Sequence, residues 1–149
     1  MRIWLPDVTL DKFIEVEANT AADHAGVVLT KLGDDFLRGT LEVNQRSAQT
    51  NGSLHGGASA ILAESLASLA ANGVVDRDRF VCLGQQINLN HLRPVPVGTT
   101  ITGTTRAHSI EETTQVWGVD IVDAADRLVC VGRVMMAVVP RPANAAKFF

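Results

Sequence analysis

The stretch GGASAILAESLASLAAN, residues 56–72, decides the fold. It is rich in alanine and leucine, the residues with the highest helix propensity, and Gly73 follows it as a stop signal. The sequence therefore predicts a long helix over residues 56–72. Because this helix is apolar around most of its circumference, we expect it to be covered by a sheet and also by a second copy of itself.

The chain before this helix predicts a short helix and a hairpin. Residues 9–24 carry apolar side chains at helical spacing, with Thr9 as the N-cap, so we expect one opening helix there. Two β-branched runs, 26–32 and 36–43, are separated by the turn residues 33–35, which is typical of an antiparallel hairpin. The polar residues that follow the hairpin predict a loop.

The chain after the helix predicts four strands joined by short turns. The strand-like runs span residues 80–92, 99–107, 114–122 and 128–139. The last run is nearly all apolar, and we expect it to be covered on both faces. This order of elements predicts an α+β domain with a mostly antiparallel β-sheet.

The length of 149 residues fits one domain, 1–149, with a helical segment at 1–25 and a flexible tail at 140–149. In that tail, Phe148 and Phe149 are available to dock on a neighbour. The Pro- and Ala-rich composition of the tail favours fraying over a stable element.

Composition narrows the classes of function. The net charge of −3 disfavours a nucleic-acid or anionic-membrane surface, since such surfaces need clustered Lys and Arg. No apolar run approaches the roughly 20 residues that cross a bilayer, and the first residues do not resemble a signal peptide, so we expect a cytoplasmic protein. Cys82 and Cys130 are far apart in apolar sequence, which predicts buried thiols and no metal site.

Glu64 is the only charged residue between Arg46 and Asp76, and it lies in the middle of the apolar helix. Burial of an unpaired carboxylate costs several kcal/mol, so this group must be solvated, paired or used in chemistry. One interpretation is a solvent-facing stripe that Ser68 and Asn72 extend at steps of four residues. The other is a catalytic carboxylate.

The residues His55-Gly56-Gly57 precede the helix, whose first N–H groups have no partner within it. These groups form a donor site for an oxygen that gains negative charge, although two glycines can also simply tighten a turn. Gly56 and Glu64 are separated by about 12 Å along the helix axis, too far for one chain to use both on one carbonyl. Two antiparallel copies of the helix would bring them together in two equivalent sites.

The chain resembles the hotdog-fold thioesterases of the 4-hydroxybenzoyl-CoA, phenylacetate-pathway and 1,4-dihydroxy-2-naphthoyl-CoA type. The resemblance rests on Gln49-Thr-Asn-Gly-Ser-Leu-His55-Gly56-Gly57, on Glu64 and Ser68 at the family's spacing, and on the patches Ile87–Arg93 and Gln115-Val-Trp117. It implies a sheet wrapped around the long central helix, paired as a homodimer and further as a dimer-of-dimers tetramer. It implies an acyl-CoA substrate with an aromatic or medium-size acyl group, and no cofactor.

The resemblance also implies a role for each site residue. Gly56 would donate its N–H to the thioester oxygen, and Glu64 of the partner would act as nucleophile or as general base. Ser68 would orient Glu64 or the water, and Gln49 and His55 would position the thioester. Substrate-binding residues would be His91, Asn90 and Gly57. Each polar residue also has a structural interpretation: loop cap for Gln49, hydrogen bonding within the helix for Ser68, helix cap for His55, and core histidine for His91.

The chain departs from the family in one hairpin. Many members carry a Gly-Arg or Gly-Lys pair where this chain has Glu111-Glu112, which would repel CoA phosphates. The candidates for holding those phosphates are therefore Arg93, Arg106 and Arg141. The departure leaves a carrier-protein thioester open as substrate. The alternative functions are a hotdog 3-hydroxyacyl thioester dehydratase or hydratase, and a non-catalytic acyl-CoA-binding module.

Overall fold

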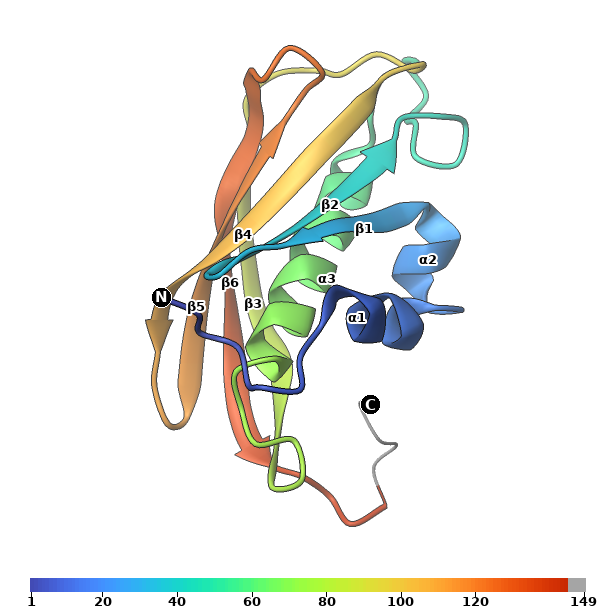
Figure 1. The fold of residues 1–149 in the computed structure, drawn as a ribbon. Coiled ribbons are helices and arrows are strands. Elements are labelled where there is room, and N and C mark those ends of the chain that lie inside the picture. The colour runs from blue at the N-terminus through green and yellow to red at the C-terminus, as the bar shows by residue number, and fades with distance from the viewer. Residues whose placement is uncertain (145–149) are drawn as a thin grey trace.

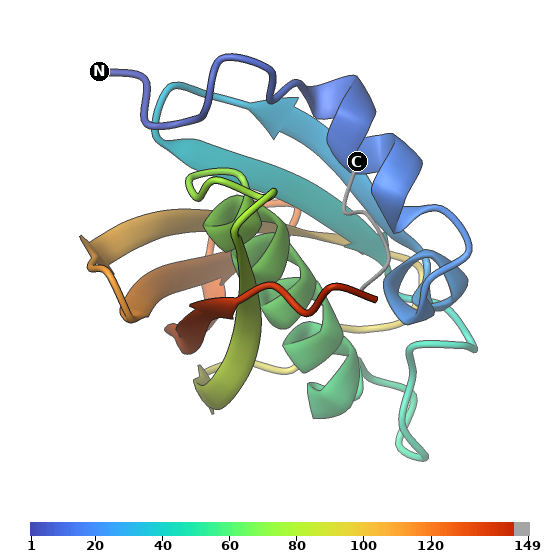
Figure 2. The same cartoon turned by 90° about the horizontal axis from the view of Figure 1, so that it is seen from below.

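A six-stranded antiparallel sheet curves around one long helix in the computed structural model, which describes residues 1–144 (Figures 1 and 2). The helix is α3 (Gly56–Asn72), and the strand order is β1-β2-β4-β5-β6-β3. The strands are β1 (Val27–Leu32), β2 (Phe36–Glu42), β3 (Phe80–His91), β4 (Thr100–Ile110), β5 (Thr114–Val122) and β6 (Leu128–Pro140). This is the hotdog fold, and it confirms the α+β architecture that the sequence predicts.

The central helix begins and ends where its composition predicts. His55 is the N-cap, with an extended backbone, and Gly73 is the C-cap, whose N–H donates to the carbonyls of Leu69 and Ala70. The bounds follow from chemistry at both ends, because glycines flank a run of strong helix formers.

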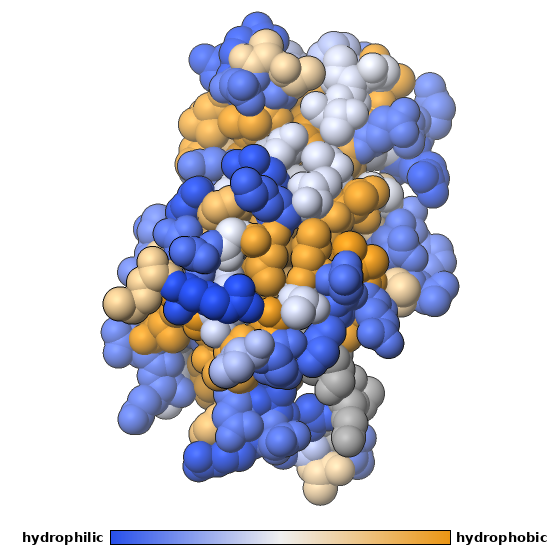
Figure 3. Space-filling view, viewed as in Figure 1, coloured by the Kyte–Doolittle hydropathy of each residue, from blue (hydrophilic) through white to orange (hydrophobic). Residues whose placement is uncertain are grey.

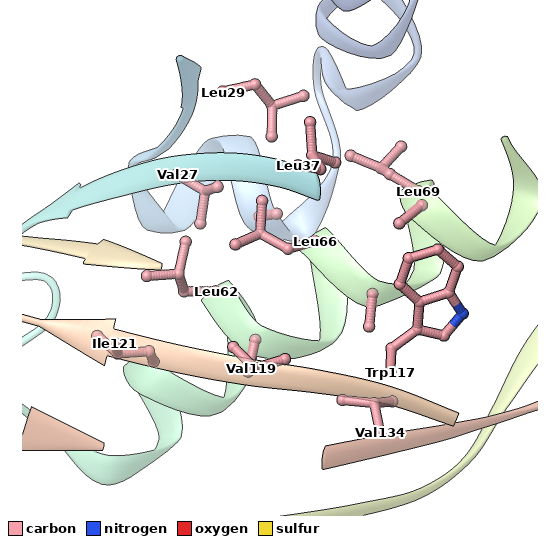
Figure 4. Close-up of a cluster of buried hydrophobic side chains, with 14 of the residues drawn as sticks. Val27, Leu29, Leu37, Leu62, Leu66, Leu69, Trp117, Val119, Ile121 and Val134 are labelled. Carbon is pink, nitrogen blue, oxygen red and sulfur yellow. The ribbon is translucent and has the colours of Figure 1, made fainter. Parts of the chain in front are cut away.

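The core lies between α3 and the concave face of the sheet. Leu62, Leu66 and Leu69 of α3 are buried and point toward the strands (Figure 4). Trp117 of β5 is also buried and stacks on Trp4, with the ring centroids 6.1 Å apart. The sheet therefore covers one side of the helix and leaves another side exposed to solvent.

The opening segment differs from the single helix predicted over residues 9–24. It forms two helices, α1 (Leu10–Glu17), which Thr9 caps as predicted, and α2 (Ala21–Ala25). Asn19 breaks the chain between them with a φ of 63°, in the left-handed region. A short polar side chain tolerates this conformation better than most others, which explains why the break falls at Asn19.

Two further predictions about the last strand need correction. The described part of the chain does not cover the outer face of β6, because Val131 and Met135 are half-buried there and Arg133 is exposed. The strand also continues to Pro140, and the Arg141 N–H donates to the Arg79 carbonyl at 2.8 Å, so the predicted tail is ordered at its start. The prediction that Phe148 and Phe149 dock on a neighbour lies outside the described residues.

Candidate active site

The start of α3 leaves one backbone donor unused. The His55 side chain accepts the Gly57 N–H on Nδ1 at 2.8 Å, and the His55 carbonyl accepts the Ala58 N–H at 2.9 Å. Within residues 1–144, the N–H of Gly56 is bonded to no acceptor. His55 is therefore a helix cap, which is one of the two interpretations of this residue. The N–H of Gly56 is then the donor that remains available to a ligand.

A cavity of about 320 Å³ lies beside this donor. Its polar lining comes from Gln49, Ser59, His91 and Arg93, together with Gly56 itself. Its apolar lining comes from Leu54, Leu92, Pro94, Val95 and Val129. The end of β3, the loop before α3 and the first turn of α3 thus converge on one opening.

His91 faces Gly56 across this opening. A β-carbon at Gly56 would lie 3.1 Å from Nε2 of His91, so the glycine allows the imidazole to approach the helix start closely. His91 is exposed. The interpretation of His91 as a core histidine is therefore wrong, and the residue lines the cavity.

Gln49 holds the loop that forms the other wall. Its Nε2 donates to the Ser53 hydroxyl at 3.0 Å and to the Leu54 carbonyl at 3.2 Å, and its own N–H donates to the Ser53 carbonyl. The loop-cap interpretation of Gln49 is confirmed by these contacts. The same contacts fix its side chain at the edge of the cavity.

Glu64 lies on the side of α3 that the sheet leaves open. The exposed residues of the helix are Gly57, Ile61 and Glu64, and Ser68 is half-buried one turn further on. Asn72 does not extend this stripe as predicted, because it is buried with 1% of its surface exposed. Glu64 is absent from the lining of the 320 Å³ cavity, so a single chain does not bring Glu64 and Gly56 to one point.

The remaining predicted substrate residues are dispersed. Arg93 lines the cavity and donates to the Leu128 carbonyl. Arg106 lies over the Phe36 ring, 4.8 Å from its centroid, and Arg141 donates to the Arg77 carbonyl. Asn90 is exposed on β3 opposite Val131, outside the cavity lining. Arg93 is thus the only one of the three arginines that lines the cavity at Gly56.

A second cavity of about 640 Å³, which the sequence does not predict, lies at the other end of α3. Its walls come from three segments that are far apart in the chain, so no local pattern marks it. Its apolar lining includes Val74, Val75, Phe80, Ile110 and Val138. Its charged lining is Asp76, Arg79, Glu111 and Glu112, which places the acidic pair of the β4–β5 hairpin at this cavity.

The strand beside the open side of α3 is β3, the last of the sheet, and within residues 1–144 no other strand pairs with its outer edge. Residues 83–88 of β3 are all exposed, including Leu83 at 52% and Ile87 at 36%. Ile61 of α3 is exposed at 37%. Figure 3, drawn in the orientation of Figure 1, shows further apolar surface in the middle of that face, with hydrophilic side chains around it.

The two cysteines are buried and free, as predicted. Burial raises the pKa of the Cys82 thiol to about 12 and also raises the pKa of Cys130, so both stay protonated at neutral pH. Among residues 1–144, no cluster of three or more His, Cys, Asp or Glu side chains could hold a metal ion. The helices of this part of the chain are too short or too polar to cross a lipid bilayer.

Comparison with known proteins agrees with this fold. The profile of the Thioesterase superfamily matches residues 51–130. A solved thioesterase of Pseudomonas aeruginosa, a glutamine-to-alanine mutant, is 34% identical with a TM-score of 0.89, covering 93% of this chain and 99% of its own. The proofreading thioesterase EntH of Cronobacter sakazakii is 36% identical over 91% of this chain and 98% of its own length.

A solved thioesterase of Staphylococcus aureus, also a glutamine-to-alanine mutant, is 27% identical with a TM-score of 0.75, covering 79% of this chain and 97% of its own. The fold and these relatives define the class: a thioester hydrolase built on the hotdog fold. The chain belongs to the thioesterase superfamily.

Proposed function

We propose that the protein hydrolyses the thioester of an aromatic or medium-size acyl-CoA at a site shared by two chains. The observation that carries this proposal is the free N–H of Gly56, which faces a cavity, while Glu64 lies about 12 Å further along the same helix on its open side. A donor and a carboxylate at that separation serve one carbonyl only if each comes from a different chain.

The open edge of β3 supplies the means of pairing. An unpaired edge strand with exposed leucine and isoleucine side chains is a template for another strand. A second β3 added antiparallel, about a two-fold axis, would also lay the two α3 helices antiparallel. Ile61 and Ile87 would then be covered, and Glu64 of each chain would approach Gly56 of the other.

The same arrangement would join the two cavities. Antiparallel helices bring the end of one α3 beside the start of its mate, so the 640 Å³ cavity of one chain would adjoin the 320 Å³ cavity of the other. The apolar walls from Val74, Val75 and Phe80 suit an acyl or pantetheine chain.

Two mechanisms fit this geometry. As a nucleophile, the Glu64 carboxylate attacks the thioester carbon, the CoA thiolate leaves, and water hydrolyses the resulting anhydride to regenerate the carboxylate. As a general base, Glu64 takes a proton from water, the hydroxide attacks the same carbon, and the proton passes to the departing thiolate. In both, the Gly56 N–H stabilises the oxygen that gains negative charge, an interaction typically worth several kcal/mol in the transition state.

The neighbouring residues take supporting roles in this proposal. Gln49 and His55 hold the loop and the helix start that present Gly56, and Ser68 lies one turn after Glu64, where its hydroxyl can orient the carboxylate or the water. His91 and Arg93 line the cavity, and the Arg93 guanidinium would be the group that contacts a substrate phosphate. The two free, buried thiols suit a reducing cytoplasm.

The relatives support the choice of residues. In the solved mutants of the Staphylococcus aureus thioesterase, the substituted glutamine and glutamate are 15 residues apart, and so are Gln49 and Glu64 here. The acidic pair Glu111-Glu112, which would repel CoA phosphates, keeps a carrier-bound acyl group as the second candidate substrate.

The test is turnover of an acyl-CoA panel by Glu64→Gln, which is nearly isosteric. We expect an unchanged fold and oligomer and a fall in kcat of about a thousandfold or more, on the scale seen when a catalytic group is removed. Wild-type turnover by Glu64→Gln would refute the proposal. Acetyl-CoA as the best substrate in the panel would refute the preference for larger acyl groups.

Mixing subunits tests the shared site separately. Glu64→Gln and Gly56→Val chains are each inactive as homodimers, but their heterodimer contains one site with both groups intact. Random reassociation should therefore restore about a quarter of wild-type activity, because half of the dimers are mixed and half of their sites are complete. No recovery after verified exchange would place both groups in one chain.

A further inference from the structure

The backbone of β3 passes so close to Glu64 that a side chain at position 84 would meet the Glu64 carboxylate. A β-carbon at Gly84 would lie 2.5 Å from Oε1 of Glu64 and 3.5 Å from its Cδ. The carboxylate therefore lies directly over the backbone of Gly84. The glycine is needed for space, because its extended strand conformation is one that any residue adopts.

A β-bulge occupies the same point of the strand. Gly84 is opposite Met136 and Gln86 is opposite Met135, so Gln85 is an extra residue in β3. A bulge bends its strand and redirects the neighbouring groups, and bulges are common at sheet edges next to active sites. Here the bend and the missing side chain coincide beneath one carboxylate.

We infer that Gly84 is a positioning residue for Glu64. Because Gly84 has no side chain, the Glu64 carboxylate can lie against the β3 backbone. In that position it would point toward the start of the partner's α3. A β-carbon at position 84 would displace the Glu64 carboxylate from this position. This inference rests on the proposed function, since it assigns Gly84 a role only through the reaction of Glu64.

Gly84→Ala should affect turnover and not folding, because the atom that the new methyl group meets is Oε1, at the end of the flexible Glu64 side chain. Rotation of Glu64 relieves the contact without moving the sheet, so Gly84→Ala should fold and assemble like the wild type. Misplacement of a reacting group by about 1 Å can lower the rate by roughly a hundredfold. We expect kcat of Gly84→Ala for an acyl-CoA to fall by about tenfold to a hundredfold, with KM nearly unchanged.

Gly118 provides the matched control. It also lies within a strand, beside a bulge between Ala107 and Ser109, and a β-carbon there would lie 2.3 Å from Nε2 of His108. Gly118→Ala therefore displaces the end of a flexible side chain just as Gly84→Ala does, but away from Glu64. We expect wild-type kcat for Gly118→Ala.

A double-mutant cycle with Glu64→Asp separates positioning from a general structural effect. Aspartate is one methylene shorter, so its carboxylate is withdrawn from position 84 and a methyl group added there has less to displace. Gly84→Ala should then lower kcat by a smaller factor in the Glu64→Asp background than in the wild-type background. Equal factors in both backgrounds would overturn the inference.

The crystal structure of Gly84→Ala gives an independent measurement. We expect the Glu64 carboxylate to move and the β3 backbone to stay in place. An unmoved carboxylate, wild-type kcat, or a variant that fails to fold would each overturn the inference, since failure to fold means that the strand yields. If Glu64→Gln is inactive while Gly84→Ala is fully active, only this inference fails; if both are fully active, the proposed function fails.

Discussion

Asn72 and Cys82 join the end of the central helix to the edge strand by two hydrogen bonds. The Asn72 Nδ2 donates to the Cys82 carbonyl at 3.1 Å, and the Cys82 N–H donates to the Asn72 Oδ1 at 2.9 Å. Asn72 thus supplies backbone partners to a strand whose outer edge is otherwise open. This link lies two residues from Gly84 and fixes the strand on which the Glu64 carboxylate rests.

Removal of this link should lower stability markedly. Asn72→Ala leaves the N–H and carbonyl of Cys82 without their buried partner, at a cost of about 2–4 kcal/mol in the free energy of unfolding. Urea denaturation measures this loss. Asn44→Ala is the control, because the Asn44 side chain accepts the Arg46 N–H in an exposed turn, and its removal should cost less. Equal losses for the two variants would contradict the structural role of Asn72.

A charge on the open edge should separate the dimer. Ile87→Lys places an ammonium group where the proposed interface covers an isoleucine, so we expect monomers in size-exclusion chromatography with light scattering and a loss of turnover. Val28→Lys is the control, since Val28 is an exposed apolar residue of β1, at the opposite edge of the sheet, and lines neither cavity of the proposed site. A dimeric, active Ile87→Lys variant would rule out pairing through β3.

The acidic hairpin should reduce the use of phosphorylated substrates. Exchange of Glu111 and Glu112 for lysine should raise kcat/KM for acyl-CoA at low ionic strength, because the cavity that they line would then attract the CoA phosphates. An acyl N-acetylcysteamine thioester, which has no phosphate, should show no gain. The double exchange of Asp34 and Asp35, an exposed acidic pair in the β1–β2 turn, should leave both values unchanged. A gain that persists at high salt would contradict an electrostatic cause.

The half-buried carboxyl of Glu17, at the end of α1, should limit stability at neutral pH. Burial raises the pKa of Glu17, although a hydrogen bond from Ser65 opposes the shift, and the Glu17 Oε1 has no partner within residues 1–144. A raised pKa in the fold means that the stabilising contribution is complete below the unfolded value of 4.5 and is lost as the pH rises through the folded pKa. Glu17→Gln should therefore raise Tm at pH 7.

This gain should shrink toward pH 4, where the wild-type carboxyl is already protonated. Thermal denaturation across that range measures it. Glu15→Gln, an exposed carboxyl on the same helix, is the control and should leave Tm nearly unchanged at both pH values. A pH-independent gain from Glu17→Gln would show that packing and not ionisation is responsible.

The central helix, the hairpin and the four later strands could be predicted because their signals are local. Glycines and His55 mark the ends of α3, the residues 33–35 mark the hairpin turn, and the later strands are runs of β-branched residues between turns. The importance of Gly56 and Glu64 could also be predicted, since one charge in an apolar helix and a glycine pair at its start are both visible in the sequence.

Other features depend on contacts that no local pattern shows. Asn72 fits the helical stripe by spacing, but its amide is drawn inward by the backbone of Cys82, ten residues later. The role of Gly84 becomes visible only when the strand lies under Glu64. The break at Asn19 did leave a signal: Thr20 accepts the Asp23 N–H, and Asp23 accepts the Asn19 N–H, in the manner of a capping box.

The two edges of the sheet are unlike each other. Helices α1 and α2 pack beside β1 (Figure 1), whereas no strand of the described residues pairs with the outer edge of β3. A sheet with only one open edge can pair with one further chain. When two chains pair through β3, each covers the open edge of the other, and no open edge remains for a third chain. Pairing of this kind stops at two chains and does not continue into fibrils, even though the single chain exposes a long edge strand with apolar side chains.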